Sequence, residues 1–177
     1  MAKVFGIQCE LAKSTAVAAL REVLSHIRKN FSDDFSRLQQ RVVRVASHPD
    51  PDEGDLGECV PHIMDRDTFW GHPERDTNPY FDDQVEILLV EKWPKRILKT
   101  TIAHELGHAA STEEQKTQAE KEIVDDSAWA SEAVADLYMM KWLGLPQIDE
   151  KALEALRDRR HHRVGFATLK EFGHIVS

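Results

Sequence analysis

The chain has 177 residues, of which 23 are Lys or Arg and 31 are Asp or Glu, so its formal net charge is -8. This length suits a single domain over residues 1–177, and the acidic balance argues against nucleic acid as a direct partner. The longest apolar run, residues 87–90, is far too short to span a membrane, and the N-terminus lacks a secretory pattern. The two cysteines make no disulfide framework. We therefore expect a cytoplasmic protein with no membrane partner.

The N-terminal third of the sequence predicts one helix followed by short elements. Apolar residues such as Leu20, Leu24 and Ile27 recur at spacings near three and four, which indicates an amphipathic helix over residues 9–30. Beyond it the pattern predicts a short helical piece at 35–40, a valine-rich strand at 41–46, a short strand at 58–64, and loops at 48–57 and 65–79.

Residues 84–90 alternate and then become continuously apolar, which is typical of a half-buried strand. Pro94 follows and suits the first turn of a helix, so the strand leads directly into a helix over residues 94–110. We hypothesise that this strand lies at a sheet edge above the functional site, where an extended peptide could pair with it through main-chain hydrogen bonds.

The helix over residues 94–110 carries His104-Glu105-Leu106-Gly107-His108, an H-E-x-x-H arrangement. Two histidines four positions apart lie about 6 Å apart along one helix face, so both imidazoles can point at one ion. Glu105 is next to the first of them and can reach a water on that ion. The motif predicts one Zn²⁺ ion with His104 and His108 as ligands and Glu105 as the general base.

A second helix, predicted over residues 127–143, offers a third ligand. Ser127 is its expected N-cap and Gly144 stands where it ends. Glu132 and Asp136 are four residues apart on an otherwise apolar face, where a buried acid needs a partner. Zinc would satisfy Glu132, and the far nitrogen of a zinc-bound histidine would satisfy Asp136. The other candidate third ligands are Asp125, Asp126, His161 and His162.

The remaining segments carry less chemistry. Residues 112–126 are strongly polar and indicate a segment that is partly helical or a mobile loop. Residues 149–160 predict a helix, and residues 164–175 predict a short element packed on the core. A second group must stabilise the oxyanion of a hydrolysed amide. The candidates are Tyr138, which helical spacing places on the face away from Glu132, and His161, His162 and Arg163. The basic run around those histidines also fits a solvated helix end.

Residues 87–108 together with residues 131–146 resemble the ImmA/IrrE family of compact gluzincin metallopeptidases. The resemblance rests on a strand leading into an H-E-L-G-H helix, on the Glu132-Ala133 pair that opens the next helix, and on Pro146 near its end. It implies His104, His108 and Glu132 as ligands, Glu105 as the base, and a cytoplasmic peptidase that cleaves a regulatory protein. Where that family usually has Asn, this chain has Asp136, which gives the E-x-x-x-D spacing of other gluzincins.

These observations lead to one expectation for the fold and two for the function. We expect an α+β, zincin-like fold in which a small mixed or antiparallel sheet packs on an N-terminal helix and two metal-binding helices. The expected function is a zinc-dependent peptidase that hydrolyses a peptide bond in a protein or peptide substrate by Glu-assisted attack of a zinc-bound water. The alternative is a metal-stabilised protein-interaction module with a silent or autoinhibited site, which the intact Glu105 disfavours.

Overall fold

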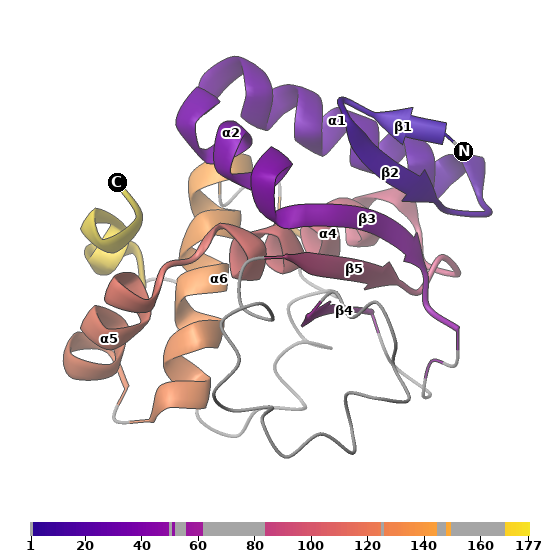
Figure 1. Cartoon of the computed structure of the whole chain (residues 1–177). Helices are drawn as coiled ribbons and strands as arrows, with labels where there is room; N and C mark the ends of the chain where they lie inside the picture. The colour runs from indigo at the N-terminus through magenta and orange to yellow at the C-terminus, as the bar shows by residue number, and fades with distance from the viewer. Residues whose placement is uncertain are drawn as a thin grey trace, which may run out of the picture.

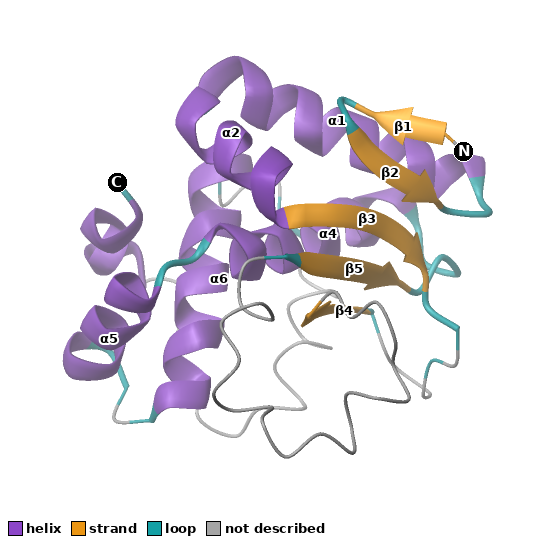
Figure 2. Ribbon diagram, in the orientation of Figure 1, coloured by secondary structure: helices purple, strands orange, loops and turns teal. Residues whose placement is uncertain are grey.

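A computed structural model of the whole chain describes residues 2–49, 51, 56–61, 84–124, 126–144, 148–149 and 169–177 (Figure 1). Within these residues the protein is a mixed α/β structure with one sheet and helices around it (Figure 2). The elements are β1 (Ala2–Val4), β2 (Ile7–Glu10), α1 (Ser14–Asn30), α2 (Ser32–Arg41), β3 (Val42–Ser47), β4 (Gly57–Pro61), β5 (Val85–Leu89), α4 (Lys95–Ala110), α5 (Glu113–Glu122), α6 (Ser127–Leu143) and the 3₁₀ helix η3 (Lys170–Val176).

The sheet of the described residues has the strand order β1-β2-β3-β5-β4. Strands β2, β3 and β5 are parallel, and the outer strands β1 and β4 run antiparallel to their neighbours. The expected strand before the H-E-x-x-H helix is β5, but it lies inside the sheet between β3 and β4. The hypothesis that β5 offers a free edge to a peptide is therefore wrong, because β4 already occupies that edge.

One face of the sheet packs against the helices. Val45, Ile87 and Cys59 lie in register across β3, β5 and β4, and Val45 and Ile87 are fully buried in the main core. On the opposite face, the Arg44 guanidinium donates to the Glu86 carboxylate at 2.7 Å. The period-two alternation of strand side chains thus separates an apolar face toward the helices from a face that carries an ion pair.

The first ten residues form a β-hairpin, which corrects the expected helix over residues 9–30. Phe5 and Gly6 adopt positive φ values of 50° and 94° between β1 and β2, which is the backbone geometry of a tight hairpin turn. Ile7 and Cys9 then alternate into the core, and α1 begins only at Ser14.

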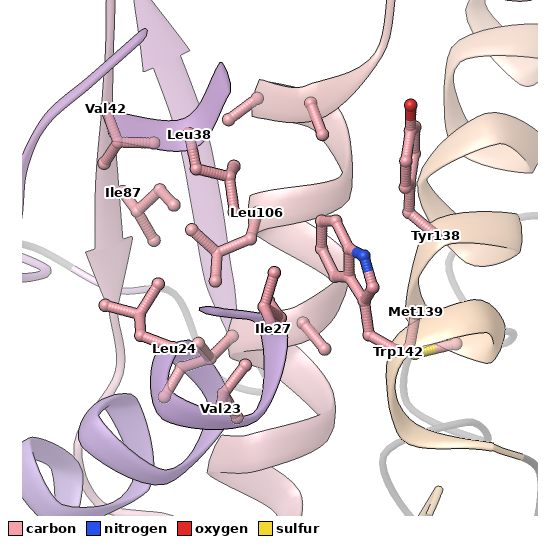
Figure 3. Close-up of a cluster of buried hydrophobic side chains, with 14 of the residues drawn as sticks. Val23, Leu24, Ile27, Leu38, Val42, Ile87, Leu106, Tyr138, Met139 and Trp142 are labelled. Carbon is pink, nitrogen blue, oxygen red and sulfur yellow. The ribbon is translucent and has the colours of Figure 1, made fainter. Parts of the chain in front are cut away.

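Helix α4 is the centre of the fold. It packs between α1 and α6 and also contacts β4 and β5. Figure 3 shows Leu106 of α4 among Leu24 of α1, Ile87 of β5 and Trp142 of α6, all fully buried. The Trp142 indole donates to the buried Asp34 carboxylate at 2.9 Å, so the polar atom of this large side chain is satisfied inside the core.

The helix ends agree with the sequence in part. Gly144 ends α6 with a φ of +71°, as expected, but the N-cap of α6 is Asp126 rather than Ser127, since the Asp126 side chain accepts a hydrogen bond from Trp129 N at 3.0 Å. The polar segment before it contains the regular helix α5, which starts with a capping box between Thr112 and Gln115. The helix expected at 149–160 falls almost wholly outside the described residues.

Candidate metal centre

Helix α4 presents the motif from a buried segment. His104 is fully buried, Glu105 is 4% exposed, and the His108 side chain is 17% exposed. Two carbonyls at the C-terminal end of α4 accept hydrogen bonds from α2. Arg37 Nη1 donates to O of Ala110, the last helical residue, at 2.9 Å, and Arg41 Nη1 donates to O of Ser111, the C-cap, at 2.6 Å. These cations also oppose the negative end of the helix dipole, next to the functional residues.

The structure brings His104, His108 and Glu132 together. One potential ligand atom from each lies within 4.8 Å of the others. Glu132 Oε2 is 3.2 Å from His104 Nε2, and Glu132 Oε1 is 3.5 Å from His108 Nε2, so the carboxylate lies across both imidazoles. Two histidines and one carboxylate are the ligand set of many catalytic zinc sites, which keep a fourth position open.

The surroundings of one buried nitrogen, His104 Nε2, indicate whether these residues fit a cation. His104 Nε2 has no hydrogen-bond partner among the described residues, since the approach of Glu132 does not have hydrogen-bond geometry. Leaving a buried nitrogen in this state is costly unless another group satisfies it. A divalent cation between the imidazoles and the carboxylate would do so, and the residues present fit such an ion.

Asp136 lies behind His104, as the helical spacing from Glu132 predicts. Its Oδ1 is 2.8 Å from His104 Nδ1, and the residue is 3% exposed. When a carboxylate accepts the Nδ1 proton, the lone pair of the imidazole is fixed on Nε2, the atom that faces Glu132. Asp136 therefore orients the His104 ring so that Nε2 faces Glu132.

Helices α4 and α6 touch backbone to backbone at the centre of this cluster. A Cβ built on Gly107 would lie 2.6 Å from Ala135 O and 2.9 Å from Ala135 Cα. No other residue type fits there without moving one helix, so the glycine inside the motif sets the separation across which Glu132 and Asp136 reach the histidines. Sequence reasoning missed this contact, because the partner of Gly107 depends on how the two helices pack.

Strand β4 lies along α4 beside Glu105. A Cβ on Gly57 would be 2.9 Å from Thr101 Cγ2, and Cys59, two residues further on, points to the same side of the sheet. Burial raises the pKa of the Cys59 thiol above its usual range, and the negative charge of Glu105 raises it further. From the sequence, Cys59 is only one of two cysteines that make no disulfide framework, whereas the structure places it next to the candidate base.

Ser131 is a second contact that sequence reasoning did not identify. Its Oγ lies 3.4 Å from His108 Nδ1, one residue before Glu132 on α6. The two histidines of the motif thus have different partners behind them, a carboxylate for His104 and a hydroxyl for His108.

Tyr138 is not available as an oxyanion contact in this arrangement. Its ring is buried against Trp142 (Figure 3). Its hydroxyl accepts a hydrogen bond from Arg37 at 2.8 Å and contacts Gln115. The other expected residues are placed as follows: Asp126 caps α6, and Asp125, His161, His162 and Arg163 lie outside the described residues.

No protein-family model, curated protein or solved structure matches this chain. None of the helices in the described part of the chain combines the length and apolarity needed to cross a bilayer.

Proposed function

We propose that this chain is a cytoplasmic zinc-dependent peptidase with a zincin-like fold, of the compact gluzincin type that the ImmA/IrrE resemblance implies. The observation that carries the proposal is the convergence of His104, His108 and Glu132 within 4.8 Å, directly beside the buried Glu105. The two free cysteines support the proposed location, since reduced thiols are usual in the cytoplasm.

The charges of the proposed ligand set suit hydrolysis. Two neutral imidazoles and one carboxylate leave a divalent cation with net positive charge, and Asp136 keeps the proton of His104 on Nδ1 so that Nε2 is free to bind. A zinc ion held there would supply Lewis acidity, which lowers the pKa of water and polarises a substrate carbonyl.

Glu105 would move the proton. It lies three residues before His108, hence on an adjacent part of the same helix surface, and it is 4% exposed. Its carboxylate would accept a proton from the attacking water and pass it to the amine as the C–N bond of the peptide breaks.

The proposed substrate is an extended segment of a protein, of the regulatory kind that the ImmA/IrrE resemblance implies. Among the described strands, β4 rather than β5 lies at an edge of the sheet. Strand β4 also contacts α4, and its Cys59 lies next to Glu105. A peptide pairing with β4 would lay its backbone across the motif helix.

The test compares the wild type with Glu105→Gln and with Glu114→Gln, an exposed control of the same chemistry on α5. Zinc content is measured for each protein, and new N-termini are quantified after incubation with a whole-cell protein extract. We expect equal zinc in all three, cleavage by the wild type and the control, and none by Glu105→Gln. Zinc binding without cleavage by the wild type would instead favour the metal-stabilised interaction module.

A further inference from the structure

We propose that Ser131 is the positioning residue for His108, the second histidine of the motif. The proposal rests on the proposed metal site and extends it. It assigns a role to a hydroxyl that lies beside the ligand cluster and that the H-E-x-x-H…E-x-x-x-D pattern does not contain.

The geometry behind the two histidines is asymmetric. His104 is fully buried, and the Asp136 carboxylate is 2.8 Å from its Nδ1. His108 is 17% exposed, and the Ser131 hydroxyl is 3.4 Å from its Nδ1. Both partners come from α6, on either side of Glu132. One helix therefore supplies the third ligand together with a contact to the back of each imidazole.

The position of the proton on the imidazole ring explains why this contact matters. A histidine that binds a cation through Nε2 carries its proton on Nδ1, and an acceptor there fixes both the tautomer and the ring orientation. The Ser131 oxygen can accept that proton, but it has no charge. It therefore orients His108 without adding the negative charge that Asp136 places behind His104.

The asymmetry predicts that the two histidines are held with different firmness. His104, buried and held by a carboxylate at short distance, is the firmly fixed ligand. His108 lies closer to solvent, and the contact that Ser131 makes with its Nδ1 is longer and uncharged. Removing the Ser131 hydroxyl should loosen His108 and weaken zinc binding by about 10-fold, the lower end of the range for lost partners of metal-bound histidines.

The test uses two variants of the same shape, Ser131→Thr and Ser131→Val. Both are β-branched and have the same helix preference, but only Thr keeps the hydroxyl. Zinc dissociation constants are measured by competition with a chelator, and the tautomer of His108 is read from ¹⁵N chemical shifts of the zinc-loaded and zinc-free proteins. Ser36→Thr and Ser36→Val, on the exposed surface of α2, form the matched control pair.

We expect Ser131→Thr to bind zinc within about twofold of the wild type and Ser131→Val to bind about 10-fold more weakly, with the control pair unchanged. We also expect Ser131→Val to populate both tautomers of His108 in the zinc-free protein. Equal affinities for Ser131→Thr and Ser131→Val would overturn the role of Ser131 while leaving the metal site intact. A wild-type protein that takes up no zinc would overturn the proposed function instead, and the role of Ser131 with it.

Discussion

Replacing Gly107 with Ala should weaken zinc binding as well as the fold. The added Cβ would lie 2.6 Å from Ala135 O, whereas ordinary van der Waals contacts of a Cβ begin at 3.4 Å. Helices α4 and α6 must therefore separate by up to about 0.8 Å at this point. Overpacking of this kind costs about 1–3 kcal/mol of stability, and the better helix propensity of Ala returns about 1 kcal/mol.

The same separation acts directly on the ligand set. Glu132 is 3.2 Å and 3.5 Å from the two imidazole nitrogens, and it moves with α6. Metal sites tolerate errors of only about 0.2 Å in ligand distance, so a shift of several tenths of an ångström should weaken zinc binding at least 10-fold. A 10-fold loss of affinity corresponds to about 1.4 kcal/mol, which lies within the net cost of about 0–2 kcal/mol expected for the zinc-free fold.

The assay for Gly107→Ala has two readouts, the zinc dissociation constant and the free energy of unfolding of the zinc-free protein in urea. Gly173→Ala is the matched control, because a Cβ at Gly173 meets nothing within 4 Å. A Gly107→Ala protein that binds zinc as tightly as the wild type would refute the argument that backbone contact between α4 and α6 sets the site.

Two further predictions concern groups next to the motif. Asp136→Asn should bind zinc about 10–100-fold more weakly, because the amide is a poorer acceptor for the Nδ1 proton of His104, and chelator competition measures the change. In a Cys9→Ala background, alkylation of Cys59 by iodoacetamide should be slow at pH 8 and should keep accelerating with pH beyond about 8.5, where an ordinary thiol is half ionised, because burial and Glu105 raise the pKa of this thiol. A labelling rate that levels off at the pH of an unfolded control would contradict the second prediction.

The elements that the sequence predicted well are those whose own pattern decides their structure. The valine-rich stretch forms β3, and the apolar spacing around the motif forms α4 from Lys95 to Ala110. The hairpin at the N-terminus escaped prediction, because Phe5 adopts a left-handed conformation that the residue type does not indicate. The position of β5 within the sheet could not be predicted from the local sequence either, because the neighbours of a strand are set by pairing between distant segments.

The candidate site divides in the same way. Spacing along a helix is a local property, so the positions of His104, His108, Glu132 and Asp136 on their faces followed from the sequence alone.

The contacts between the helices did not follow from spacing, since they require the rotation and separation of α6 relative to α4. The contact of Gly107 with the backbone of Ala135, and that of Ser131 with His108, exist only in one relative placement of the two helices. Zinc ligands from both helices would favour that same placement. We therefore infer that ion binding and close packing of α4 on α6 reinforce each other, since each is most favourable in the geometry that the other requires.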